Sequence, residues 1–125
     1  MKAGREHRVP LATQTVELLN ELPLFDSGLL FEGRPGKPMS ESAMLAVLKR
    51  MHRQDITVHG FRSTFRDWCA EQTSFPREVA EAALAHVNRD RVEAAYLRTD
   101  LLKKRLQLMT RWGEFVSGET ASESL

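Results

Sequence analysis

The sequence contains a single cysteine, Cys69, so it has neither a disulfide framework nor a cysteine-based zinc site. No apolar run approaches the roughly 18 residues of a membrane-spanning helix. The first residues, "MKAGREHRVP", lack the hydrophobic segment of a signal peptide. We therefore expect a reducing, cytoplasmic setting and no membrane partner.

The chain also has almost no excess of positive over negative charge. The chain carries 18 Lys and Arg against 17 Asp and Glu, which gives a formal net charge of +1. This balance excludes a protein coated in basic charge. If the chain binds nucleic acid, its binding surface must be a local patch, and other interactions must carry much of the affinity. The length of 125 residues suffices for one compact domain with a core.

Apolar spacing predicts a mainly helical chain with at most a minor β element. Prolines and glycines make residues 24–40 a loop, within which Leu29–Phe31 is expected to form a short buried strand. Residues 118–125 are expected to form a flexible tail. The expected helices cover residues 13–22, 41–53, 57–72, 76–86, 91–98 and 101–116.

Helix caps and buried stripes follow from the same pattern. Thr13, Ser40 and Thr57 are expected N-caps of the first three helices. The third helix should bury Phe61, Phe65 and Trp68. The last helix should place one apolar stripe against the core, made of Leu102, Leu106, Met109, Trp112 and Val116.

His59 and Arg62 fall together on another face of the third helix, near its beginning. The helix macrodipole disfavours cations at this end, so their presence suggests a bound anion. The planar fork of Arg62 suits two phosphate oxygens, and His59 can donate a hydrogen bond or move a proton. The pair therefore suggests an anion site, although a capping or surface histidine and a surface ion pair are the commoner roles of such residues.

His86 and Tyr96 are two further candidates. His86 ends an expected helix, where the dipole supports a protonated imidazole, and Tyr96 is the only tyrosine. Nearby cations would lower the pKa of the phenol from about 10 and stabilise charge developing on a phosphate. A tyrosine oxygen could then attack a phosphodiester. Ordinary packing roles remain open for both residues on spacing alone.

Three stretches resemble the C-terminal catalytic half of a tyrosine recombinase, most closely the phage and genomic-island integrases. They are "HGFRSTFRDW", "VAEAALAHV" and "VEAAYLRTDLLKKRLQLMTRW". "KAGREHRVPL" resembles the end of the family's β-hairpin, and "GKPMS" resembles the turn before the next helix. The resemblance covers residues 2–117. It implies a compact, mainly α catalytic domain of the DNA breaking-rejoining type, with a remnant β element near the N-terminus.

The resemblance implies site-specific DNA recombination through a 3′-phosphotyrosyl intermediate. Tyr96 would attack the scissile phosphate, and Lys2 would protonate the leaving 5′ oxygen. Arg62, His59 and His86 would hold the non-bridging oxygens. No metal or cofactor is expected, because the covalent bond stores the phosphodiester energy.

Further expectations concern DNA and partners. Contact with the DNA backbone is expected from Lys37, Ser40 and Arg66, although a solvated basic surface explains each equally well. The resemblance implies double-stranded attachment-site DNA as the substrate and, for the full-length parent, a homotetramer in which the last helix, Leu101–Val116, could be exchanged. The first arginine of the family pattern lies upstream of the β-hairpin, so we expect the chain by itself to be inactive or nearly so.

Two alternatives compete with this interpretation. Residues 77–98 could form a non-catalytic helix-turn-helix module that binds DNA. A metal site made of His52, His59 and His86 is disfavoured, because no pair has the i, i+4 spacing of a helical zinc site.

Overall fold

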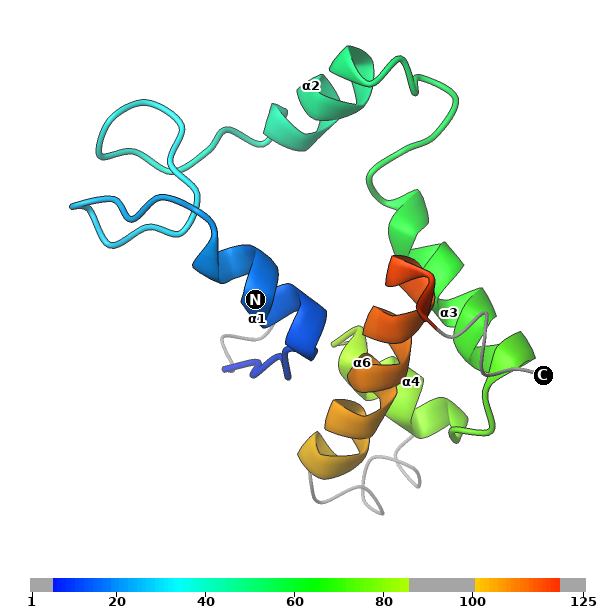
Figure 1. Cartoon of the computed structure of the whole chain (residues 1–125). Coiled ribbons are helices and arrows are strands. Elements are labelled where there is room, and N and C mark those ends of the chain that lie inside the picture. The colour runs from blue at the N-terminus through cyan, green and yellow to red at the C-terminus, as the bar shows by residue number, and fades with distance from the viewer. Residues whose placement is uncertain (1–5, 86–100, 120–125) are drawn as a thin grey trace. The chain divides into compact units, whose positions relative to one another are not determined.

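The computed structural model describes residues 6–85 and 101–119 of the chain. These residues contain no strand, and only an isolated antiparallel bridge joins Glu32 to Pro38. The predicted mainly helical fold is therefore confirmed. The described helices, labelled in Figure 1, are α1 (Thr13–Asn20), α2 (Ala43–Arg50), α3 (Gly60–Gln72), α4 (Arg77–Ala83) and α6 (Leu102–Ser117).

Several expectations fall wholly or partly outside these ranges. The expected helix over residues 91–98 lies outside the described residues. The same is true of most of the expected tail, residues 120–125. The remnant β element is not seen in residues 6–12, and residues 1–5 are not described. None of the described helices is long and apolar enough to cross a membrane.

Contacts between residues divide the chain into two units. The first unit combines Met1–Asn20 with Phe65–Leu125, and the second is Glu21–Thr64. The boundary falls within α3.

The core of the first unit is built by α3, α4 and α6. An aromatic cluster lies at its centre, because the ring centroid of Trp112 is 5.1 Å from that of Phe65, edge to face, and 5.1 Å from that of Trp68. Aromatic rings bury a large apolar area and also prefer particular orientations toward one another, such as edge to face. The buried members of the core are Phe65, Trp68, Cys69, Val79, Ala80 and Leu108.

The buried face of α6 differs from the predicted stripe. Met109 and Trp112 pack against the core as expected, but Leu106 and Val116 are 47% and 60% exposed. The reason is that α6 packs against α1 as well as α4, so two neighbours set its buried face. The buried residues of this face are Arg105, Leu108 and Gly113. Two of them, Arg105 and Gly113, are not hydrophobic and could not be recognised from apolar spacing.

Gly113 allows α6 to approach the start of α1 closely. A Cβ atom added at this glycine would lie 2.6 Å from the Cβ of Ala12 and 2.7 Å from Oε1 of Gln14. Ala12 is buried, and its carbonyl accepts the N–H of Val16 in the first turn of α1. Its Cβ is therefore fixed by the backbone and cannot move aside.

Replacing Gly113 by alanine is expected to lower the free energy of unfolding by about 1–3 kcal/mol, despite alanine's better helix propensity, because the methyl group overpacks the contact. Chemical denaturation measures this change. The double variant Ala12→Gly/Gly113→Ala should recover part of the loss, because it removes the atom that the new methyl group meets. Gln107→Ala, on the exposed side of α6, is the control. Equal stability of the wild type and Gly113→Ala would contradict the close approach.

The second unit contains α2 and the predicted loop. A tight turn closes this loop on itself, because Gly33 N–H donates to the Lys37 carbonyl (3.0 Å) and Lys37 N–H donates to the Arg34 carbonyl (2.8 Å). The expected buried strand over Leu29–Phe31 is wrong. Leu30 and Phe31 are exposed, and no described strand lies beside this segment to pair with it.

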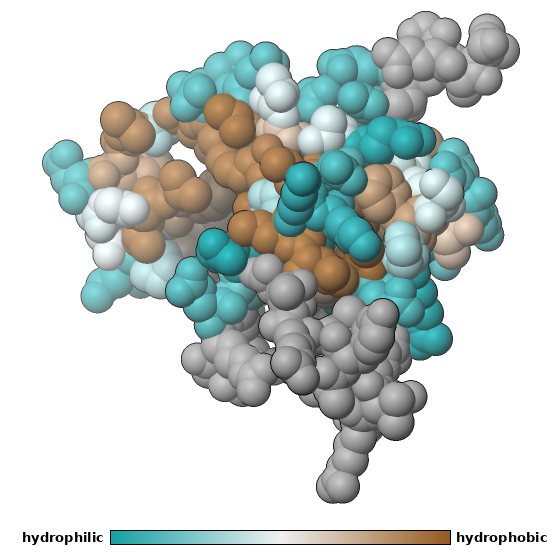
Figure 2. Space-filling view, turned by 90° about the horizontal axis from the view of Figure 1, so that it is seen from below, coloured by the Kyte–Doolittle hydropathy of each residue, from teal (hydrophilic) through white to brown (hydrophobic). Residues whose placement is uncertain are grey.

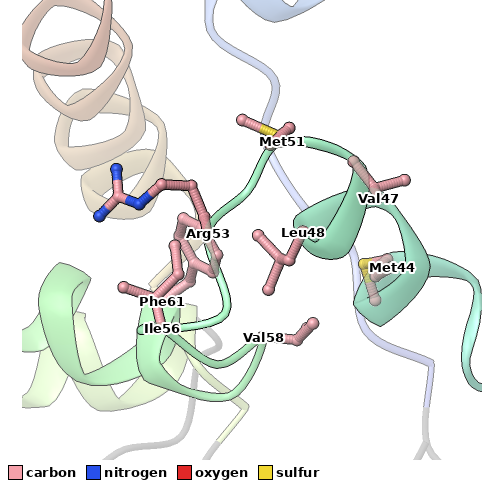
Figure 3. A pocket seen from close by; sticks show the side chains of 8 residues that line it. All are labelled: Met44, Val47, Leu48, Met51, Arg53, Ile56, Val58 and Phe61. Atoms are coloured by element: carbon pink, nitrogen blue, oxygen red, sulfur yellow. The ribbon is translucent and has the colours of Figure 1, made fainter.

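α2 and the segment that leads to α3 enclose an apolar pocket of about 450 Å³ (Figure 3). Leu48 forms its buried wall, and Phe61 also lines it. The expectation that Phe61 is buried is therefore wrong, because this side chain is 55% exposed and faces the pocket rather than a closed core. Apolar side chains, brown in Figure 2, also reach the surface elsewhere among the described residues.

Candidate functional site: the start of α3

Thr57 shapes the turn that carries His59 and Arg62. Its Oγ1 accepts a hydrogen bond from the N–H of Gly60 at 3.0 Å, the bond typical of an N-cap side chain. The N–H of Arg62 donates to the His59 carbonyl at 3.0 Å, so the two residues share one hydrogen-bonded turn. The predicted cap is confirmed, and it fixes the backbone of both candidate site residues.

The electrostatics of this turn favour an anion. The first turn of α3 contains no acidic residue and lies at the positive end of the helix dipole. His59 is exposed and Arg62 is half-buried. A guanidinium and an imidazole can together donate several hydrogen bonds to the oxygens of one phosphate group, and the positive end of the helix dipole adds a favourable field.

Replacing Thr57 by alanine is expected to cost about 1 kcal/mol of stability, because the N–H of Gly60 loses its side-chain acceptor. Thermal or chemical denaturation measures the change. Thr64→Ala is the matched control, since the Thr64 hydroxyl donates to the Gly60 carbonyl within the same helix without capping it. If both variants lost the same stability, the capping role of Thr57 would be wrong.

Arg66 lies one turn further along α3 and forms an ion pair. Its Nη2 is 2.7 Å from Oε1 of Glu81 on α4, and Nε of Arg77 is 3.5 Å from the same oxygen. Both arginines therefore share one partly buried carboxylate. Contact of Arg66 with a DNA phosphate would compete with Glu81 for the guanidinium.

Lys37 and Ser40 are exposed in the loop that precedes α2. The Ser40 hydroxyl lies 3.3 Å from the hydroxyl of Ser42, and the Ser40 carbonyl accepts the N–H of Ala43. The expected N-cap at Ser40 is wrong, because α2 begins at Ala43 and Ser42 holds the capping position without a side-chain cap bond. The two neighbouring serines bond to each other instead.

Three of the predicted catalytic residues, Lys2, His86 and Tyr96, lie outside the described residues. The structure therefore brings together only His59 and Arg62 of that set. Within residues 6–85 and 101–119, no three His, Cys, Asp or Glu side chains are grouped so that they could hold a metal ion.

Sequence patterns did not reveal Arg105, a charged residue buried within α6. Its Nη2 donates a hydrogen bond to the carbonyl oxygen of Arg8. Cys69 is buried in the first unit, and burial raises the pKa of its thiol to about 11. The thiol is therefore protonated at neutral pH, which suits packing rather than nucleophilic chemistry.

Comparison with known proteins identifies a family. The family model described as "Phage integrase family" matches residues 1–102. The prophage integrase IntA of Escherichia coli K12 is 36% identical over 121 residues, which cover 93% of this chain and 29% of that protein. The integrases of Shigella phage Sf6 and Enterobacteria phage P4 are 33% and 34% identical, again over 93% of this chain, which spans 31% and 28% of their lengths. No solved structure matches the chain.

The chain thus spans less than a third of each of these integrases. Its mainly helical fold fits a catalytic-type domain of such proteins. On the match over residues 1–102, the chain belongs to the phage integrase family of tyrosine recombinases.

Proposed function

We propose that this chain forms the C-terminal part of a site-specific DNA recombinase that cuts and rejoins DNA through a 3′-phosphotyrosyl intermediate. The observation that carries the proposal is the capped first turn of α3, which holds His59 and Arg62 at a helix N-terminus without an acidic neighbour in that turn. Membership of the integrase family supplies the reaction class.

In the proposed reaction the Tyr96 phenol loses its proton to water, its oxygen bonds to the scissile phosphorus, and the bond from phosphorus to the 5′ oxygen breaks. Lys2 gives its proton to that leaving oxygen. Arg62, His59 and His86 donate to the non-bridging oxygens, where negative charge builds up in the transition state. The reaction needs no cofactor, because the phosphotyrosyl bond is exchanged for the new phosphodiester.

The proposed partner is double-stranded DNA, at the attachment sites of a mobile element, with Lys37, Ser40 and Arg66 near its backbone. The full-length parent would act as a tetramer. Among the described residues α6 packs against α1 and α4 of its own chain, so exchange of this helix between subunits would require these contacts to be replaced.

A chimaera tests the proposal. This chain replaces the matching C-terminal part of the prophage integrase IntA, and the product is incubated with duplex DNA that the intact relative recombines. We expect a protein–DNA adduct that survives detergent and is released by protease. Mass spectrometry of the digested adduct should place the phosphate on the peptide that contains Tyr96.

The second candidate function is a helical DNA-binding module without catalysis, because residues 77–98 were also compatible with a helix-turn-helix. A chimaera that binds the DNA with the affinity of the intact relative, yet gives no adduct, would favour this candidate. The intact relative serves as the positive control for both binding and cleavage.

A further inference from the structure

Arg105 is the one charged or polar side chain that is fully buried among the residues the structure describes, with 2% of its surface exposed. It lies in the first turn of α6, where its N–H donates to the Leu101 carbonyl. Burying a guanidinium carries a large desolvation cost, and a well-packed apolar residue of similar volume would avoid it. Stability alone therefore gives a weak reason for an arginine at this position.

The buried guanidinium reaches the backbone of a distant segment. Its Nη2 donates to the carbonyl oxygen of Arg8, 97 residues earlier in the chain. Arg8 precedes α1, in a stretch of the first unit that forms neither helix nor strand. A directional hydrogen bond to one carbonyl specifies which residue of this stretch lies beside Arg105.

Two further contacts continue the attachment along α6. Ala12 lies at Gly113, as described above, and Nε2 of Gln14 donates to Oε2 of Glu119 at 2.8 Å, just beyond the end of the helix. The contacts follow the same order in both segments. Residues 8–14 therefore form a strap that runs along α6 in the direction of the helix.

The reach of the chain from Arg8 to Ala12 can be compared with the rise of α6 from Arg105 to Gly113. The rise from Arg105 to Gly113 along an α-helix is roughly 12 Å. The chain from Arg8 to Ala12 can span at most roughly 13–14 Å when it is fully extended. The chain from Arg8 to Ala12 is therefore long enough to make both contacts, and a shift of its register by one residue would break either the Arg105 bond or the Gly113 contact.

We propose that Arg105 is a positioning residue that sets the register of the strap on α6 and thereby places the chain that leads to Lys2. The proposal rests on the proposed function, in which Lys2 is the general acid and Tyr96 the nucleophile. Lys2 lies six residues before Arg8, and Tyr96 lies six residues before the start of α6. Arg105 thus joins the stretch that follows Lys2 in the chain to the helix that follows Tyr96.

Distance measurement by pulsed electron paramagnetic resonance on the full chain tests the proposal. Spin labels are attached at Glu6→Cys, just before the strap, and at Gln107→Cys on the exposed side of α6. Cys69 is 3% exposed with a raised thiol pKa, so it should remain unlabelled in the folded protein, which labelling of the wild type verifies. With Arg105 unchanged, we expect one narrow peak in the distribution of distances between the two labels.

Adding Arg105→Met is expected to abolish the narrow peak while helical circular dichroism is retained, because methionine fills the space but offers no donor. Arg105→Lys should restore a narrow peak, since its ammonium group can still donate to the Arg8 carbonyl. Arg111→Met, the same change on the exposed side of α6, is the control and should leave the peak intact. If Arg105→Met does not fold, Arg105→Leu, which also lacks a hydrogen-bond donor, replaces it with the same two outcomes.

An unchanged narrow peak in folded Arg105→Met or Arg105→Leu would overturn the positioning role, because a residue that only stabilises the core would give this result. The measurement does not depend on DNA cleavage. If Arg105→Met lost the narrow peak, and the chimaera with Arg105 unchanged gave no DNA adduct, the positioning role of Arg105 would stand and the proposed function would be rejected.

Discussion

Replacing Tyr96 by phenylalanine is expected to abolish the covalent protein–DNA adduct in the chimaera, with a loss of about 10⁴-fold or more in the rate of cleavage. Phenylalanine keeps the ring and its packing but has no oxygen to bond to phosphorus. Removing the nucleophile of an enzyme leaves only the catalysis that binding and charge stabilisation provide. DNA affinity should change little, because a single hydroxyl contributes at most one hydrogen bond to binding.

The measurement is single-turnover adduct formation, with DNA affinity measured separately by fluorescence anisotropy. Ser63→Ala is the matched control, because it removes an exposed hydroxyl beside Arg62 on α3. It should leave the rate unchanged. Persistence of the adduct in Tyr96→Phe, or its loss in Ser63→Ala, would assign the nucleophile to another residue.

Replacing Arg62 by glutamine is expected to slow adduct formation by about 10²–10³-fold, the scale of losing one preorganised donor to a developing oxyanion. Glutamine keeps a polar side chain of similar length but no charge. The capped turn should remain intact, because Thr57 holds Gly60 through a contact that Arg62 does not make. Arg62→Lys should recover only part of the rate, since an ammonium cannot present two parallel donors to a phosphate.

Rates are compared under saturating DNA, so that a weaker complex is not mistaken for slower chemistry. Arg111→Gln removes one positive charge from the exposed side of α6 and serves as the control for a general loss of charge. A rate for Arg62→Gln equal to that of Arg111→Gln would show that Arg62 acts only through long-range attraction of DNA.

Local signals in the sequence predicted the parts of the structure that depend on near neighbours. The end of α3 at Gln72, the loop over residues 24–40 and the cap at Thr57 each follow from residues a few positions apart. The turn that holds His59 and Arg62 likewise follows from residues a few positions apart. Its place at the start of α3 was therefore predictable from spacing alone.

Features that depend on distant segments were missed. Periodicity shows that a helix has an apolar face but not which neighbours meet it, so the exposure of Phe61 and Leu106 was not foreseen. Arg105 gave no signal, since arginine is rarely fully buried and its acceptor is a backbone carbonyl. The roles of Lys2, His86 and Tyr96 rest on resemblance to the family, because no local pattern joins them.

The aromatic cluster determines what a spectroscopic unfolding experiment on this chain will report. Both tryptophans of the sequence, Trp68 and Trp112, lie in the first unit, with ring centroids 5.1 Å apart. Tryptophan emission therefore follows the melting of that unit alone, whereas far-ultraviolet circular dichroism also includes α2 of the second unit. Coincident transitions by the two probes would mean that the two units melt as one cooperative body, and separated transitions would give each unit a stability of its own.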